Sequence, residues 1–128
     1  HNVNFYSPIL IASELSKKTK YYNIDLHIAN ISTGAARKAL PKWAAYCSSK
    51  AAAKIYLDCL AEEEAHVKVE HIDPGALNTD MQKKIRNSEI EFDCETRIFS
   101  NLKENGGLLE PDVAAKKIIK TLIGKQMI

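Results

Sequence analysis

The sequence predicts an α/β protein built on a parallel sheet, with this chain supplying one part of that sheet. Three observations support this prediction. Predicted helices and strands alternate along the chain, a long alanine-rich segment lacks glycine and proline, and each predicted strand leads into a loop with glycine or proline. This alternation is typical of a doubly wound parallel sheet, in which helices cover both faces.

The first half of the chain contains a predicted helix followed by a predicted strand. Apolar residues recur at helical spacing from the start, so a helix is expected over residues 2–18, with Pro8 either kinking it or lying in a first turn. Residues 24–32, "IDLHIANIS", alternate between apolar and polar side chains and then reach Thr33-Gly34. This pattern predicts a strand that ends in a loop.

The next part of the chain repeats this order of a predicted helix followed by a predicted strand. Residues 44–65 are rich in alanine and place apolar side chains at helical intervals, which predicts a long helix. Residues 66–73, "HVKVEHID", predict a second strand that closes at Pro74-Gly75.

Two helical stretches are expected after the second strand. The first is a polar stretch over residues 78–92. The last helix should begin near Pro111, because proline is favoured in a first turn, and should end at Gly124.

Two strands are too few for a stable doubly wound sheet. We therefore expect the remaining strands to lie outside this chain, and the apolar residues at both of its ends also suggest a fragment. Neither a repeat nor a low-complexity linker divides the sequence, so residues 1–128 are expected to form a single partial domain.

Composition argues against several classes of partner. Eighteen basic and sixteen acidic side chains give a net charge of +2 without a block of like charges, which argues against a nucleic-acid partner. An apolar run of the roughly 20 residues needed to cross a bilayer is absent, so no membrane association is expected. The three cysteines and four histidines show no metal-binding spacing, which favours reduced thiols, a cytoplasmic location and no metal site.

The segment "WAAYCSSKAAA" places Tyr46 and Lys50 four residues apart in the long predicted helix. Side chains at this spacing share a helix face, where an ammonium group can stabilise a tyrosinate. Because reactive groups of open α/β sheets lie at the carboxyl ends of strands, Ser32, Thr33 and Thr79 are the hydroxyls expected nearby.

Four segments together resemble the short-chain dehydrogenase/reductase family in a single register. "NISTGAA" (30–36) resembles the strand end that carries the catalytic hydroxyl, and "YCSSK" (46–50) resembles the Y-x-x-x-K motif. "DPGALNTDM" (73–81) resembles the P-G-x-x-x-T segment, and Asn4 matches the asparagine of the first helix. Within the family, the similarity is greatest to sepiapterin reductases and to microbial benzil (1,2-diketone) reductases.

The resemblance implies the catalytic half of a Rossmann-like fold and a carbonyl reductase activity with NADP(H). Tyr46 would be the general acid, and Lys50 would lower the tyrosine pKa and hold the nicotinamide ribose. Thr33 would bind the carbonyl oxygen, and Asn4 would hold a water molecule. The expected cofactor-binding residues are Tyr46, Lys50, Pro74, Gly75 and Thr79. The implied substrate is a ketone or 1,2-dicarbonyl, and the implied assembly is a homodimer or homotetramer.

The sequence departs from the family pattern at three places. Counting thirteen residues back from Tyr46 reaches Thr33 instead of a serine, so Ser32 remains an alternative for the catalytic hydroxyl. Asp73 stands where a small or amide residue is expected, and Glu70 and His71 are unusually polar for a buried parallel strand. The five glycines form no phosphate-binding fingerprint.

Other interpretations remain open from the sequence. Thr79 is alternatively a helix N-cap, and Asn2 competes with Asn4. At the level of the whole protein, the alternatives are a non-catalytic dinucleotide-sensing or scaffold protein of the same fold, or a fragment that is inactive in isolation.

Overall fold

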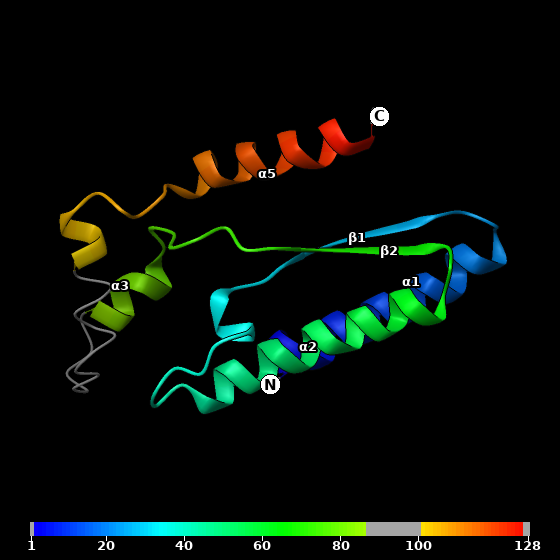
Figure 1. Cartoon of the computed structure of the whole chain (residues 1–128), viewed down its shortest axis with the longest axis horizontal. Coiled ribbons are helices and arrows are strands. Elements are labelled where there is room, and N and C mark those ends of the chain that lie inside the picture. Colours follow the sequence, from blue (N-terminus) through cyan, green and yellow to red (C-terminus); the bar gives the residue numbers. More distant parts are fainter. Residues whose placement is uncertain (1, 87–100, 127–128) are drawn as a thin grey trace. The chain divides into compact units, whose positions relative to one another are not determined.

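The computed structural model describes residues 2–86 and 101–126. The chain forms two compact units, His1–Asp73 and Pro74–Ile128. The first unit contains both strands and two long helices, and the second contains the remaining helices (Figure 1). The predicted order of helices and strands is therefore confirmed within the described residues.

The first unit begins with helical structure and alternates as predicted. Its elements, in chain order, are the π-helix η1 (Asn2–Tyr6), α1 (Ser7–Tyr21), β1 (Leu26–Ile31), the 3₁₀ turn η2 (Gly34–Ala36), α2 (Ala44–Glu63) and β2 (Val67–Ile72). The single helix expected over residues 2–18 is thus a π-helical turn followed by an α-helix. Pro8 lies in the first turn of α1, where its missing N–H costs no hydrogen bond.

The first helix continues beyond residue 18, its predicted end, to Tyr21. Beyond it, the backbone N–H groups of Tyr22 and Asn23 donate to carbonyl oxygens of the last turn. Asn23 adopts a φ of 54°, a left-handed conformation that asparagine tolerates better than most residues. This local cap ends the helix and turns the chain toward β1.

The strands β1 and β2 pair in parallel, with Leu26 opposite Val67 and Ile31 opposite Ile72. The ladder extends one step beyond β1, because the Ser32 N–H donates to the Ile72 carbonyl oxygen at 2.7 Å. Helix α2 connects the two strands, so the predicted α/β fold with a parallel sheet is confirmed.

The core of the first unit lies between the sheet and helices α1 and α2. Its buried members are Ala12, Leu57, Leu60 and Val67, and the partly buried Leu26, Ile28, Tyr56 and Val69 pack against them. Alternate residues of β1 belong to this core, whereas the intervening His27, Ala29 and Ile31 are exposed. The helix-facing side of the sheet therefore carries the strand residues that belong to the core.

The second unit contains α3 (Asp80–Arg86), a short helical segment at 101–104 and α5 (Pro111–Gln126). An isolated parallel bridge joins Leu77 to Leu109, which the sequence did not predict. The polar helix expected over 78–92 is observed as α3, and residues 87–92 lie outside the described residues. Cys94 also lies outside them, whereas Cys47 and Cys59 are free thiols.

The predicted end of the last helix was wrong. The sequence predicts an end at Gly124, but α5 continues to Gln126. Gly124 does not adopt the left-handed conformation by which a C-terminal glycine ends a helix, and it remains an ordinary helical residue. In the described part of the chain, none of the helices combines the length and apolar character needed to cross a membrane.

Candidate active site

The first two turns of α2 carry Tyr46 and Lys50, and both side chains are partly buried. The predicted spacing on one helix is therefore observed. The ring of Trp43, directly before the helix, meets the Tyr46 ring edge to face, with centroids 5.5 Å apart and planes at 83°. Aromatic pairs prefer this arrangement, so Trp43 restricts the orientation of the phenol.

Thr33 lies two residues beyond the end of β1, as the N-cap residue of η2. Its hydroxyl oxygen accepts a hydrogen bond from the Ala35 N–H at 3.3 Å. The same hydroxyl forms a hydrogen bond with the Tyr46 phenol. Of the two hydroxyls that the sequence left open, Thr33 is the one that the structure pairs with Tyr46, and which of them is the catalytic hydroxyl stays a prediction.

The pKa of Tyr46 is raised above its ordinary value. Partial burial is the main cause because it disfavours the charged phenolate, while the Thr33 hydrogen bond acts in the opposite direction. The charges of Cys47 and Asp73 raise the pKa further. Burial sets the direction of this shift, and the lowering of the pKa by Lys50 that the resemblance implies stays a prediction. The phenol is therefore protonated at neutral pH.

Asp73 brings a carboxylate to the carboxyl end of β2. Its Oδ2 lies 3.7 Å from Arg37 Nη2, and a Cβ added to Gly34 would lie 3.7 Å from the same oxygen. The sequence identified Asp73 as a departure from the family pattern but gave no sign of its partner. The Arg37 side chain is 62% exposed, so this ion pair contributes little to stability.

Asn4 lies within the π-helix η1 and is partly buried. Contacts join η1 to α2, the helix that carries Lys50. π-Helical turns are rare and are frequent at functional sites. The structure thus places Asn4 in a helix that packs against the catalytic candidate, and its role in holding water stays a prediction.

Pro74, Gly75 and Thr79 belong to the second unit. Gly75 adopts a φ of 77°, a conformation that favours glycine. The Thr79 hydroxyl oxygen accepts a hydrogen bond from the Gln82 N–H at 3.4 Å, directly before α3. This is the capping role that the sequence left open for Thr79, and contact with a cofactor stays a prediction for all three residues.

A comparison with protein families decides the assignment. The family model described as short chain dehydrogenase matches residues 1–90, which is more than half of the chain. This chain belongs to the short-chain dehydrogenase family. The matched region of this short-chain dehydrogenase includes Thr33, Tyr46 and Lys50.

Individual relatives of this short-chain dehydrogenase are named as reductases. A benzil reductase ((S)-benzoin forming) from Bacillus cereus is 36% identical over 121 residues, covering 91% of this chain and 49% of the relative. A sepiapterin reductase from Xenopus tropicalis is 33% identical over 120 residues, covering 93% of this chain and 46% of the relative. The chain thus spans about half the length of these curated relatives.

A solved structure confirms the fold. The crystal structure of the KRED1-Pglu enzyme is similar with a TM-score of 0.63 and 37% sequence identity, covering 69% of this chain and 38% of that one. The α/β arrangement described above is therefore that of a partial Rossmann-like fold.

Short-chain dehydrogenases use NAD(P)(H), so the site must suit a nicotinamide dinucleotide. The phenol of Tyr46, the ammonium of Lys50 and the hydroxyl of Thr33 are hydrogen-bonding groups suited to the ribose and to a polar substrate. A glycine-rich phosphate loop is absent from the sequence. The residues present fit the nicotinamide end of the cofactor and not its diphosphate.

Across the described residues, no cluster of His, Cys, Asp and Glu suits a metal ion.

Proposed function

We propose that this chain is the catalytic half of an NADPH-dependent reductase that acts on a ketone or 1,2-dicarbonyl of the benzil or sepiapterin type. The observation that carries the proposal is the hydrogen bond between Thr33 and Tyr46, with Lys50 one turn further along the same helix. The names of the relatives from Bacillus cereus and Xenopus tropicalis support the substrate class.

In the proposed reaction, Tyr46 is the general acid. The phenol is protonated at neutral pH, so it can donate its proton to the carbonyl oxygen as that oxygen gains negative charge. The bound cofactor supplies the hydride that reaches the carbonyl carbon. The substrate becomes an alcohol, and Tyr46 is left as a tyrosinate that must be reprotonated.

Lys50 and Thr33 support this proton transfer. The Lys50 ammonium stabilises the tyrosinate from the same helix face and also binds the ribose hydroxyls. The Thr33 hydroxyl donates to the developing oxyanion, which is the form of stabilisation that favours the transition state. Its position is fixed because the Ala35 N–H binds the same oxygen atom.

The roles proposed for the other residues rest on the resemblance of their segments. Asn4 holds a water molecule that returns a proton from solvent to Lys50. Pro74, Gly75 and Thr79 contact the nicotinamide carboxamide. The preference for NADPH over NADH also rests on the resemblance, and comparing KM for the two cofactors tests it.

The assay that tests the proposed function follows NADPH oxidation by the full-length protein with benzil and with sepiapterin. Tyr46→Phe removes the proton donor while keeping the ring, so kcat should fall by about 10²–10⁴-fold. The matched control is Tyr22→Phe, an exposed tyrosine at the end of α1, which should leave kcat unchanged.

Two outcomes would contradict the proposal. Equal turnover by wild type and Tyr46→Phe would show that Tyr46 is not the acid. Failure of the wild type to oxidise NADPH with any dicarbonyl would instead favour a dinucleotide-sensing or scaffold protein.

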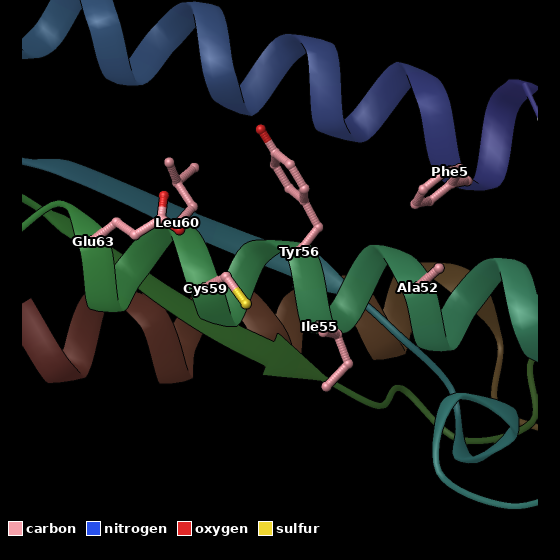
Figure 2. Close-up of a pocket in the computed structure, with 7 residues that line it drawn as sticks. All are labelled: Phe5, Ala52, Ile55, Tyr56, Cys59, Leu60 and Glu63. Carbon is pink, nitrogen blue, oxygen red and sulfur yellow. The ribbon is translucent and has the colours of Figure 1, made fainter.

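We also propose that the protein forms a homodimer through η1, α1 and α2. A groove of about 420 Å³ lies along α2, lined by Phe5, Ala52, Ile55, Tyr56, Cys59, Leu60 and Glu63. Figure 2 shows Tyr56 and Leu60 pointing from α2 toward α1. Large apolar side chains are exposed on the same helices, namely Val3, Tyr6, Leu10, Ile11, Leu15 and Ile55. An apolar surface on adjacent helices suits a second copy of the same surface.

The oligomeric state tests this surface. Ile55 is 60% exposed, and Ile55→Glu should convert a dimer of the full-length protein to a monomer in light scattering. Ile24→Glu is the matched control, because Ile24 is 55% exposed and lies outside the groove. A monomeric wild type would exclude the dimer.

A cytoplasmic location is proposed as well, in keeping with the free thiols of Cys47 and Cys59.

A further inference from the structure

Four polar side chains form a continuous chain of hydrogen bonds between the sheet and α2. The Asn30 amide lies 2.9 Å from His71 Nδ1, and His71 Nε2 lies 2.7 Å from Asp58 Oδ1. Lys54 Nζ donates to Asp58 Oδ2 at 2.6 Å. We call these four residues the His71 network.

The hydrogen-bonding roles in the His71 network are mutually consistent. When the Asn30 amide donates to Nδ1, the proton of a neutral His71 is on Nε2 and is donated to the Asp58 carboxylate. The pKa of Asp58 is lowered, chiefly by the Lys54 hydrogen bond and also by His71, so this acceptor is ionised at neutral pH. Both ring nitrogens of His71 are therefore satisfied.

The centre of the His71 network is well shielded from water. The His71 side chain is 13% exposed and Asp58 is 40% exposed, so the chain runs from the interior toward the surface of α2. A polar group buried to this extent is costly when its partner is removed. The polarity of His71, which was unexpected for a parallel strand, is explained by these two partners.

The His71 network joins the elements that carry the active-site candidates. Asn30 lies on β1, three residues before Thr33, and is paired in register with His71 on β2. Asp58 and Lys54 lie on α2, and Lys54 is one turn beyond Lys50. The same strand and helix hold the Thr33 hydroxyl and the Tyr46 phenol, whose hydrogen bond depends on how α2 sits on the sheet.

We propose that His71 is a positioning residue that, through Asn30 and Asp58, holds the strand end bearing Thr33 against the helix bearing Tyr46. The proposal rests on the proposed function for its catalytic consequence. A residue that does not react can still be needed for the full rate, because a displacement of about 1 Å in an active site can lower the rate about 10²-fold. The hydrogen bonds of His71 go to Asn30 and Asp58, so His71 acts on Thr33 and Tyr46 through the elements that it connects.

The test compares three variants of the full-length protein. His71→Phe keeps a ring of similar size but removes both hydrogen bonds, and His71→Gln keeps one donor and one acceptor. The matched control is His27→Phe, because His27 lies on β1 but is exposed on the opposite face of the sheet. All are assayed well below their melting temperatures, so that loss of folded protein does not lower the rate.

His71→Phe should lower kcat about 10- to 100-fold with KM for NADPH unchanged, and His71→Gln should recover most of that loss. A readout that needs no turnover is the pKa of Tyr46, obtained by ultraviolet titration against Tyr46→Phe. Loss of the Thr33 hydrogen bond in His71→Phe should raise this pKa further, whereas His27→Phe should not change it.

Two results separate the possible failures. An active wild type with unchanged kcat and an unchanged Tyr46 pKa in His71→Phe would overturn the positioning role and leave the proposed function standing. An inactive wild type would refute the proposed function, and the Tyr46 titration would still decide whether His71 positions the pair. If His71→Phe does not fold, Asp58→Asn tests the same link from its exposed end and should shift the Tyr46 pKa in the same direction.

Discussion

The hydroxyl of Thr33, at the end of β1, and the phenol of Tyr46, near the start of α2, share a hydrogen bond. The 3₁₀ turn η2 makes this contact possible, because Thr33 caps that turn and its oxygen is bound by the Ala35 N–H. The Trp43 ring packs edge to face with the phenol ring and restricts its rotation. The Thr33 hydroxyl and the Tyr46 phenol are thus held next to each other by η2 and the start of α2.

Removing the Thr33 hydroxyl should identify the group that binds the substrate oxygen. Thr33→Val preserves the β-branched shape and should lower kcat by about 10²–10³-fold, the usual effect of deleting an oxyanion donor. Thr33→Ser retains the hydroxyl and should keep most of the activity. Ser32→Ala is the comparison that resolves the alternative left open by the sequence, and a larger loss there than in Thr33→Val would transfer the role to Ser32.

The raised pKa of Tyr46 predicts a loss of stability in alkaline solution. The unfolded chain ionises its tyrosine near pH 10, whereas the folded chain does so at higher pH. The contribution of Tyr46 to the free energy of unfolding is therefore fully present below about pH 10. It is lost as the pH rises through the pKa that Tyr46 has in the folded chain. Urea unfolding of wild type and Tyr46→Phe should show a stability difference that changes only in alkaline solution. A constant difference across that range would show that the phenol is not shielded from water.

Asp58 predicts the opposite behaviour in acid. The pKa of the Asp58 carboxyl in the folded chain is lowered from 3.8, chiefly by Lys54 and also by His71. The stabilisation that the carboxylate gives the folded state is therefore fully present above pH 3.8. The contribution is lost as the pH falls through the folded pKa. The free energy of unfolding of wild type should therefore fall in acid more steeply than that of Asp58→Asn. Parallel pH profiles for the two proteins would mean that the carboxylate gains nothing from its partners.

Two glycine substitutions should change stability in opposite directions. A Cβ added at Gly75 meets no atom within 4 Å, but its φ of 77° strains any other residue, so Gly75→Ala should destabilise the protein by about 1–2 kcal/mol. Gly124→Ala also meets no atom and lies in α5, where alanine is favoured, so it should stabilise by about 0.5–1 kcal/mol. Urea unfolding of the full-length protein measures both. Stabilisation by Gly75→Ala would show that its loop relaxes to an ordinary conformation.

A shortened side chain in the core tests how α2 is held on the sheet. Leu57 is 2% exposed and belongs to the buried cluster between α2 and the strands. Leu57→Ala should lower the free energy of unfolding by about 2–5 kcal/mol, through lost burial and the cavity left behind. Ile55→Ala on the same helix should cost far less, because Ile55 is largely exposed. Equal losses would indicate that the helix can move to fill the space.

The sequence alone determined the features that depend on neighbouring residues. Helical and strand periodicities located β1, α2 and β2 to within a few residues, because alternating and 3.6-residue patterns are local. The Tyr46–Lys50 spacing is local in the same sense, whereas the thirteen-residue count to Thr33 comes from the resemblance to the family. The end of α5 was misjudged because a glycine ends a helix only when its backbone turns left-handed, and its identity alone does not decide that.

Only the tertiary structure decided the environment of those residues. The direction of the Tyr46 pKa shift depends on how far the phenol is buried, and the ion pair of Arg37 with Asp73 joins residues 36 positions apart. The contact of Asn30 with His71 spans 41 positions. Burial and long-range contacts arise when strands and helices pack, and their strength depends on distances that no local pattern encodes. The catalytic candidates were therefore visible in the sequence, whereas the groups that set their charge and position were not.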